Sequence, residues 1–271
     1  MAQPERWQLS GHGPESYEQH MVPAIFAPCA ASLVAHAALR PGEQVLDAAC
    51  GTGMVARLVA PQVGEAGCVT GLDLNPDMLA VARALAPPSG APMTWQEGSV
   101  EALPFEDGTF DVVLCQQGLQ FCPNRAGAVR EMRRVLRAGG RLCCSVWRDL
   151  LHSPYNMAVV QAVTQHINPE AGQRMRAPFM LGNREELRTL LQTAGFQDVH
   201  IQIDILPMRV GSFEQFLPGQ FAASPIANDV AALDVTARRR FFEQITLALQ
   251  PYRDDAGYTI PLETHIAQAQ A

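Results

Sequence analysis

The stretch VLDAACGTGM, residues 45–54, limits the possible folds of this chain more than any other feature. A short apolar run meets an acid, and two glycines separated by one residue follow. Glycine adopts left-handed backbone angles and has no Cβ, so the pattern predicts a tight turn from a strand into a helix beside a ligand. Gly51 to Ala56 match the dinucleotide fingerprint G-x-G-x-x-A, which alone is a weak signal. A turn that holds no ligand is the alternative.

Short apolar segments alternate with helical segments after residue 43. This alternation predicts an α/β fold with a parallel sheet, helices on both faces, and ligands at the carboxyl ends of the strands. Asn75 and Pro76 predict a helix start, as does Asn183. The expected strands are 44–49, 67–75, 92–98, 107–117, 141–147 and 197–203, and the expected helices are 54–63, 77–85, 124–140 and 183–196. The last strand is either LPMRV (206–210) or YTIPLETHI (258–266).

Three parts of the chain do not follow the alternation. Residues 1–20 are mostly polar and include two glycines close together, which predicts a mobile arm. Residues 22–39 predict an amphipathic helix interrupted near Pro28. Segments 150–182 and 205–257 are rich in Met, Phe, Pro and Arg, and we expect them to form a cap over the edge of the sheet.

Composition excludes several classes of protein. All 20 basic residues are arginine, so a Schiff-base lysine and a P-loop are excluded. The formal charge of −7 does not favour nucleic acid as a partner. The 7 cysteines include no C-x-x-C pair and no Asp, Glu and His cluster is evident, so we expect no metal site. The N-terminus has no signal-peptide pattern and no apolar run long enough to span a membrane, which predicts a cytoplasmic protein without membrane insertion.

Two acids indicate which ligand the glycine-rich turn holds. Asp47 precedes the first glycine, where it would repel a pyrophosphate. Asp73 ends the second strand, where a carboxylate can accept hydrogen bonds from both hydroxyls of a ribose. The implied ligand has a ribose and a cationic end and needs no phosphate site. S-adenosylmethionine, a nucleoside with a sulfonium and an α-amine, meets these requirements.

Four motifs in order carry a family resemblance. VLDAACGTG, GLDLNPDML, GSVEALPFEDGTFDVVLCQQGLQF and REMRRVLRAGGRL resemble the motifs of class I S-adenosylmethionine-dependent methyltransferases. The most similar branch includes ubiquinone and menaquinone biosynthesis methyltransferases and many small-molecule enzymes. The resemblance, good over 40–147, implies a Rossmann-like, doubly wound, mostly parallel seven-stranded sheet with helical cap insertions. We therefore expect residues 1–40 to form an arm and lid, 41–150 the cofactor-binding core, and 151–271 the rest of the sheet with the acceptor pocket.

The resemblance also implies roles for individual residues. Ala49 replaces the usual first glycine of the loop, and Ser99 replaces an Asp that commonly binds the adenine amino group. The implied cofactor contacts are Asp47 near the methionine amino group; Ala49, Cys50, Gly51 and Gly53 along the methionine; Asp73 at the ribose; Leu74 and Met78 beside the adenine; Ser99 and Val100 at its edge; Cys115 or Gln116 at the methionine end; and Tyr17 closing over the cofactor.

The acceptor side is less constrained by the sequence. Gln117, Gln120, Trp147 and Phe179 are candidates to bind the acceptor, and His152 is the candidate base. Core packing or a surface position is the alternative for each. A row of arginines from Arg130 to Arg141 could bind an anionic partner, but a solvated helix face is the favoured explanation.

The sequence therefore predicts a methyltransferase that acts on a small, partly apolar acceptor by in-line displacement. Alternatives are a protein that binds S-adenosylmethionine without methylating, a methyltransferase for RNA or protein, and an NAD-dependent oxidoreductase. The sequence does not indicate the acceptor, the methylated element or the oligomeric state.

Overall fold

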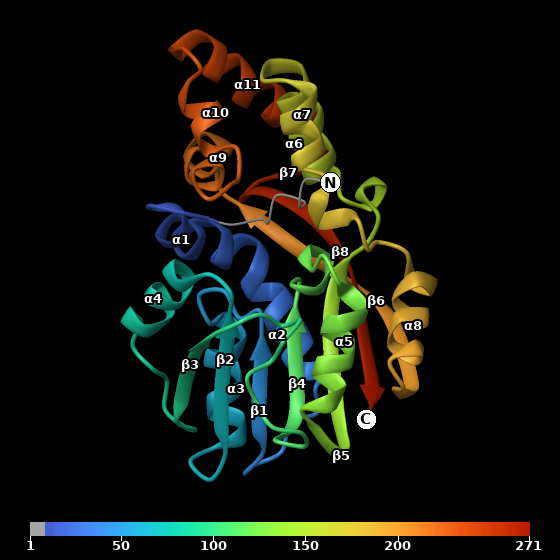
Figure 1. Ribbon diagram of the computed structural model, residues 1–271. Coiled ribbons are helices and arrows are strands. Elements are labelled where there is room, and N and C mark those ends of the chain that lie inside the picture. The colour runs from blue at the N-terminus through green and yellow to red at the C-terminus, as the bar shows by residue number, and fades with distance from the viewer. Residues whose placement is uncertain (1–8) are drawn as a thin grey trace.

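The computed structural model describes residues 9–271, and a single twisted sheet organises it (Figure 1). The strand order is β3-β2-β1-β4-β5-β8-β6. Neighbours from β3 to β5 are parallel, whereas β8 is antiparallel to both β5 and β6. The predicted mostly parallel α/β fold is confirmed. The strands are β1 Gln44–Ala48, β2 Cys68–Asp73, β3 Met93–Glu97, β4 Phe110–Gln116, β5 Leu136–Trp147, β6 Gln197–Val210, β8 Gly257–Gln270, and the short β7 Arg253–Asp254, which pairs with β8.

Helices cover both faces of the sheet because successive strand residues point to opposite sides. Val45 packs with α2 (Ala27–His36) and α3 (Met54–Val63) in one apolar cluster. Its neighbour Leu46 packs with α5 (Arg125–Arg134) and α8 (Arg184–Thr193) in the other. The predicted cap Asn75 accepts from the backbone of Asp77 at the start of α4 (Pro76–Ala84). Asn183 caps α8 in the same way.

The N-terminal segment differs from the predicted mobile arm. Its described part is helical: α1 (Gly13–Ser16), then the π-helix η1 (Tyr17–Phe26), which continues into α2. The Ser16 hydroxyl donates to the carbonyl of Gly219, and the Asn75 side chain donates to the carbonyl of Leu9. Such contacts come from distant parts of the chain, and the local sequence does not reveal them. Residues 1–8 of the predicted arm lie outside the described residues.

Two further differences concern strand boundaries. The helix predicted over 124–140 ends at Arg134, and residues from Leu136 onwards belong to β5. Both Val135 and Leu136 are buried, so the chain enters the sheet before the two glycines. LPMRV and YTIPLETHI both lie in strands, because LPMRV is the second half of β6 and pairs with β8 from Leu206–Leu262 to Val210–Tyr258.

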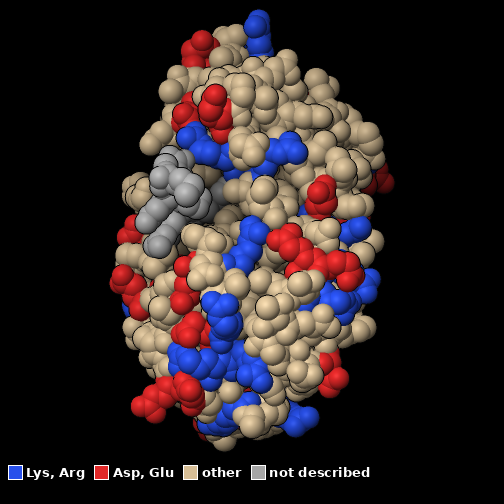
Figure 2. Space-filling model, turned by 45° about the vertical axis from the view of Figure 1, so that its right-hand side comes forward, with Lys and Arg blue, Asp and Glu red and all other residues tan. Residues whose placement is uncertain are grey.

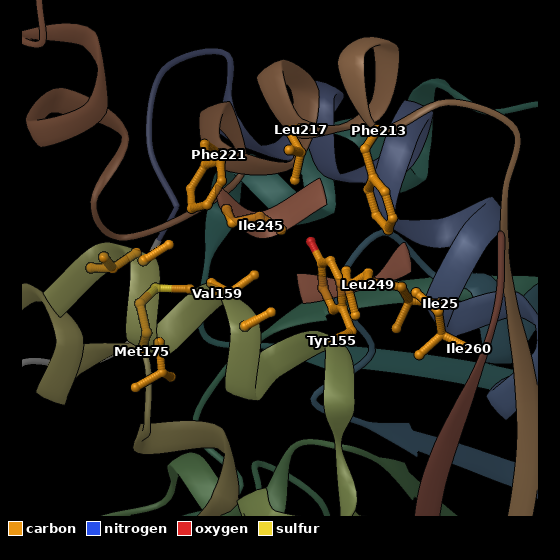
Figure 3. Packing of buried hydrophobic residues seen from close by; sticks show 14 of the residues in the cluster. Ile25, Tyr155, Val159, Met175, Phe213, Leu217, Phe221, Ile245, Leu249 and Ile260 are labelled. Atoms are coloured by element: carbon orange, nitrogen blue, oxygen red, sulfur yellow. The ribbon is translucent and has the colours of Figure 1, made fainter. Parts of the chain in front are cut away.

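The remaining helices form a cap above the carboxyl ends of the strands (Figure 1). Their apolar side chains make a third core, in which Val159, Phe213 and Ile245 come from three different helices (Figure 3). The β6–β8 ribbon contributes Met208 and Ile260 to the same core. No helix in the described part of the chain is long and apolar enough to cross a membrane. The cap elements are η3 Leu150–His152, α6 Pro154–His166, α7 Pro169–Arg174, η4 Ala177–Phe179, α9 Phe213–Ala222, α10 Ala227–Ala231, α11 Val235–Ala248 and η5 Gln250–Tyr252.

Candidate active site

A cavity of about 250 Å³ lies where the strand ends, the N-terminal helices and the cap meet. It is lined at one end by the tips of β1, β2 and β4 and at the other by the cap. Eleven of the predicted site residues contribute to it: Tyr17, Ala49, Gly51, Asp73, Leu74, Met78, Ser99, Val100, Gln116, Trp147 and Phe179. Residues from seven separate stretches of sequence therefore meet at one place.

The glycine-rich loop has the backbone that its sequence predicts. Ala49, Gly51 and Gly53 have φ angles of 59°, 55° and 81°. The left-handed angle at Ala49 gives a physical reason why glycine would also suit this position. Gly53 does not line the cavity; a Cβ there would lie 2.2 Å from the ring of Trp95. The close approach that requires this glycine is therefore to a side chain of β3.

Asp73 points into the cavity from the end of β2. One carboxylate oxygen accepts from the backbone N–H of Gly51 (2.7 Å), and the other accepts from the N–H of Asn75 (2.9 Å). Each oxygen keeps further lone pairs, so both remain able to accept from a ligand. Burial raises the pKa of Asp73, while these two N–H bonds lower it.

Asp47 lies elsewhere than the resemblance implies. Its side chain is buried behind the loop, with 1% exposure, and does not line the cavity. One oxygen accepts from the N–H of Ala56 (3.0 Å) in the first turn of α3, and the other has no partner among the described residues. Burial raises the pKa of this carboxyl to about 7. The hydrogen bond of Asp47 is therefore to α3, the helix that follows the loop.

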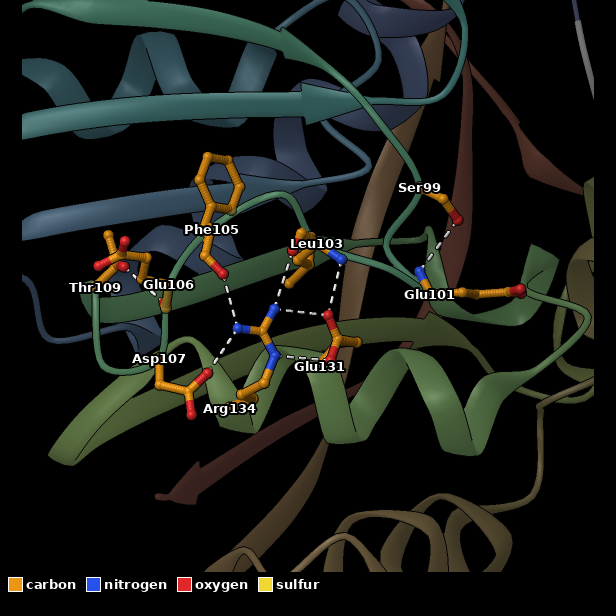
Figure 4. A network of polar contacts seen from close by, with 9 residues as sticks. All are labelled: Ser99, Glu101, Leu103, Phe105, Glu106, Asp107, Thr109, Glu131 and Arg134. Carbon is orange, nitrogen blue, oxygen red and sulfur yellow. Dashed lines mark hydrogen bonds and ion pairs between the residues drawn. The ribbon is translucent and has the colours of Figure 1, made fainter.

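One arginine on α5 holds the segment that carries Ser99 and Val100. Arg134 of α5 donates to the carbonyls of Leu103 and Phe105 and pairs with Glu131 and Asp107 (Figure 4). These interactions fix the crossover between β3 and β4. The hydroxyl of Ser99 accepts from the N–H of Glu101, so it stabilises its own turn.

Aromatic rings line the cavity from the lid towards the cap. Tyr17 and Phe26 have centroids 4.9 Å apart, Phe26 and Trp147 6.3 Å, and Trp147 and Phe179 6.5 Å. Gln116, at the end of β4, donates to the carbonyl of Phe26 (2.8 Å) and ties the lid to the sheet. Removal from solvent raises the pKa of Tyr17, so its hydroxyl stays protonated.

The N-terminal helix is also tied to the glycine-rich loop. Glu18 accepts from the hydroxyl of Thr52, the residue between the two glycines, and pairs with Arg57 at 2.7 Å. Arg57 in turn donates to the carbonyl of Thr52. The loop and the helix that carries Tyr17 therefore form one connected unit.

Five predicted site residues besides Asp47 lie outside the cavity lining: Cys50, Gly53, Cys115, Gln120 and His152. Cys115 is fully buried in the sheet, and burial also raises the pKa of its thiol. His152, at the surface of the cap, faces Arg148 (3.1 Å) and Glu263 (3.9 Å). This position does not favour His152 as a base for an acceptor in the cavity.

Three further polar residues line the cavity: Gln117, which the sequence offered as a partner for the acceptor, and Tyr155 and Gln220, which were not predicted as site residues. Gln117 follows the predicted Gln116, and its φ of 49° is unusual for a residue other than glycine. Tyr155 and Gln220 come from α6 and α9 of the cap. No local sequence signal marks either of them, because only the folding of the cap brings them to the sheet.

The described lining residues fit a cationic nucleoside better than a dinucleotide. Asp73 offers two oxygens to ribose hydroxyls, and Leu74 and Met78 provide apolar surface for a base. No Arg or His side chain lines the cavity within residues 9–271, so a diphosphate would find no cationic side chain. These residues would hold S-adenosylmethionine, which supplies an activated methyl group when bound.

Comparisons with known proteins agree with this chemistry. A family model described as "Methyltransferase domain" matches residues 46–144. The ubiquinone/menaquinone biosynthesis C-methyltransferase UbiE of Paraburkholderia xenovorans is 32% identical over 191 residues, which cover 66% of this chain and 79% of that protein.

Two solved structures share the fold. A putative methyltransferase from Bacillus halodurans C-125 matches with a TM-score of 0.55 and 23% identity, over 89% of this chain and 97% of that one. Phosphoethanolamine N-methyltransferase 2 of Haemonchus contortus, in complex with phosphomonomethylethanolamine and S-adenosylhomocysteine, matches with a TM-score of 0.57 and 18% identity, over 95% and 56%. The chain belongs to the class I S-adenosylmethionine-dependent methyltransferases, and S-adenosylmethionine is its methyl donor.

Proposed function

We propose that this enzyme methylates a small, partly apolar organic acceptor that binds under the cap. The observation that supports this most strongly is the continuity of the cavity. Asp73 and Gly51 line its sheet end, and Trp147 and Phe179 line its cap end. A nucleoside at the first end and an acceptor at the second would meet inside one enclosed space.

The proposed roles of the cofactor residues follow from their positions. Asp73 accepts from the ribose hydroxyls, and Leu74 and Met78 contact the adenine. Ala49 and Gly51 contact the methionine part, with Gln116 nearby. Ser99 and Val100 lie at the adenine edge, where the Ser99 hydroxyl, which accepts from the N–H of Glu101, keeps its own O–H to donate. Tyr17 closes the cavity from the N-terminal side.

The reaction needs positioning more than proton transfer. Displacement requires the acceptor atom, the methyl carbon and the sulfur to lie in line, and holding two reactants in that geometry is a large part of catalysis. The rings of Phe26, Trp147 and Phe179 exclude water and orient a flat or apolar acceptor. Asp73 and the glycine-rich loop hold the donor.

RNA and protein are less suitable acceptors than a small molecule. Three members of the arginine row form ion pairs: Arg134 with Glu131, Arg137 with Asp111, and Arg141 with Glu43. On the face shown in Figure 2, arginines are interspersed with acidic residues and form no continuous basic surface. All seven cysteines are free thiols, which suits the reducing cytoplasm where we place the reaction.

Transfer of labelled methyl groups tests this proposal. The enzyme is incubated with methyl-labelled S-adenosylmethionine and a panel of phenols, quinones and amines. We expect label in at least one small acceptor. Phe179→Ala should lower kcat/KM for that acceptor about tenfold, because it removes a wall of the cavity, and should leave the Kd for S-adenosylhomocysteine unchanged.

A matched control uses another phenylalanine of the cap. Phe242 packs against Phe221 and Phe241 and lies outside the cavity lining, so Phe242→Ala should leave kcat/KM within about twofold. Label that appears only in RNA or in protein would contradict the proposal, as would equal losses in the two variants.

A further inference from the structure

Three buried polar groups in the cavity lining have no hydrogen-bond partner among residues 9–271. They are the side-chain carbonyls of Gln117 and Gln220 and the hydroxyl of Tyr155. All three side chains are at least nine-tenths buried, with exposures of 4%, 3% and 1%. An unpaired buried polar group destabilises a fold, so three of them in one apolar cavity call for a specific explanation.

Tyr155 is fixed by the packing of its ring. The ring stacks on Phe213 at 6.1 Å and meets Phe216 edge-on at 6.2 Å. In Figure 3 it rises from α6 with its hydroxyl pointing towards α9. Burial raises the pKa of this hydroxyl well above its usual range, so it remains a donor as well as an acceptor.

Gln117 is fixed by hydrogen bonds instead. Its backbone N–H donates to the carbonyl of Ser145, and its side-chain N–H donates to the hydroxyl of Thr264 at 3.0 Å. Thr264 in turn donates to the carbonyl of Val146. This chain of bonds sets the orientation of the amide and leaves its carbonyl free. The left-handed backbone at Gln117 is a strained conformation of the kind that occurs at functional sites.

Gln220 lies one helical turn after Phe216 on α9, so both side chains are on the same face of the helix. Phe216 contacts the ring of Tyr155, which places this face of α9 opposite α6. The cap thus contributes an amide and a hydroxyl, and the sheet contributes a second amide.

The charges around the cavity restrict the acceptor further. Asp73 and Glu101 are the acidic side chains among the described lining residues, and both belong to the sheet end of the cavity, where the methyl donor would bind. Asp73 accepts from the N–H groups of Gly51 and Asn75, and Glu101 accepts from the N–H of Asn124. No cationic side chain within residues 9–271 lines the cap end, so an anionic acceptor would be buried without a counter-charge.

We propose that Gln117, Tyr155 and Gln220 recognise the acceptor, and that the acceptor is an uncharged molecule with a hydroxyl group beside an apolar body. The inference rests on the proposed function and specifies the substrate class of that same site. Two amide carbonyls require a donor, and the tyrosine hydroxyl can pair with either a donor or an acceptor. A hydroxyl both donates and accepts. One such group can therefore donate to an amide carbonyl and accept from the hydroxyl of Tyr155.

Three molecules of similar size test this class in the intact enzyme saturated with S-adenosylhomocysteine: phenol, toluene and benzoate. Their affinities are measured by ligand-observed NMR titration. Phenol should bind most tightly, because it alone is uncharged and carries a hydroxyl. Tyr155→Phe and, separately, Gln220→Met should each weaken phenol binding about three- to tenfold and leave toluene binding unchanged.

The control is Tyr258→Phe, the same substitution at the start of β8. The hydroxyl of Tyr258 accepts from Gln250 and lies outside the cavity lining, so phenol binding should not change. If phenol binds no better than toluene and benzoate, undetectable binding included, or if neither cavity variant discriminates, the inference is overturned. If the unmodified protein does not bind S-adenosylhomocysteine, the proposed function is contradicted instead. Titration of S-adenosylhomocysteine alone distinguishes the two failures.

Discussion

The two glycines of the loop have different surroundings. Gly51 lines the cavity, and a Cβ there would meet no atom within 4 Å. Gly53 faces Trp95 and has a φ of 81°. The sequence pattern predicts that both must be glycine, but it does not distinguish contact with a ligand from contact with a buried ring.

Gly53→Ala and Gly51→Ala should therefore rank in opposite order for loss of stability and for loss of cofactor binding. Strain and overpacking against Trp95 should cost Gly53→Ala about 2–4 kcal/mol of unfolding free energy. Gly51→Ala should cost only about 1–2 kcal/mol, from its left-handed backbone, but should weaken S-adenosylhomocysteine binding more. Denaturant unfolding and calorimetry measure the two quantities, and the same rank order in both assays would contradict this account.

Asp47 makes the stability of the enzyme depend on pH. Its pKa is about 7 in the folded protein and about 4 when unfolded. Between these values the folded state binds more protons than the unfolded state, so this group's contribution lowers stability as pH rises, by up to about 1.4 kcal/mol per unit.

Asp47→Asn should reduce this loss because the amide does not titrate. The free energy of unfolding of both proteins is measured from about pH 5 to pH 8. The difference between variant and parent should move in favour of the variant as pH rises and level off above about pH 7. A difference that is independent of pH would show that Asp47 is not buried as described.

At the residue level, the sequence predicted much of the lining at the sheet end of the cavity. Asp73, Leu74, Met78 and Ser99 stand in motifs whose order along the chain follows the strands. Tyr155 and Gln220 were not predictable, because their positions depend on how two cap segments fold onto each other.

At the level of elements, the N-terminal helices show what local sequence cannot reveal. The polar stretch before residue 20 reads as an arm, yet Glu18 bonds to Thr52 and Arg57, and Ser16 bonds to Gly219. Helix α3 was predicted from its own pattern with its observed bounds, Met54–Val63, because that helix packs on the strand beside it in sequence.

Glu18→Ala should release the N-terminal helix from the glycine-rich loop. Faster hydrogen exchange is expected in peptides covering residues 9–26, together with weaker S-adenosylhomocysteine binding, because Tyr17 would no longer be held over the cavity. Glu15→Ala, an exposed site on α1, is the control and should change neither. Unchanged exchange in the Glu18 variant would mean that the contacts of Glu18 with Thr52 and Arg57 do not hold the helix.

At the scale of the whole molecule, the sheet and the cap have separate apolar cores that the β6–β8 ribbon joins. The cavity lies between these cores. The alternation of strands and helices along the chain predicted the sheet, and the interruption of that alternation indicated the cap. The length of the ribbon was not predictable, since LPMRV (206–210) and YTIPLETHI (258–266), far apart in the sequence, each gave only a partial strand signal.

The proposed function depends above all on Asp73 binding the ribose of the methyl donor at the sheet end of this cavity. Calorimetric titration of S-adenosylhomocysteine into the parent, Asp73→Ala and Asp77→Ala enzymes tests it most directly, with circular dichroism to confirm folding. Asp77 is exposed in the first turn of α4 and serves as the control. We predict that Kd rises at least tenfold for Asp73→Ala, because hydrogen bonds to a carboxylate are lost, and stays within about twofold for Asp77→Ala. An unchanged Kd in a folded Asp73→Ala enzyme would contradict the account.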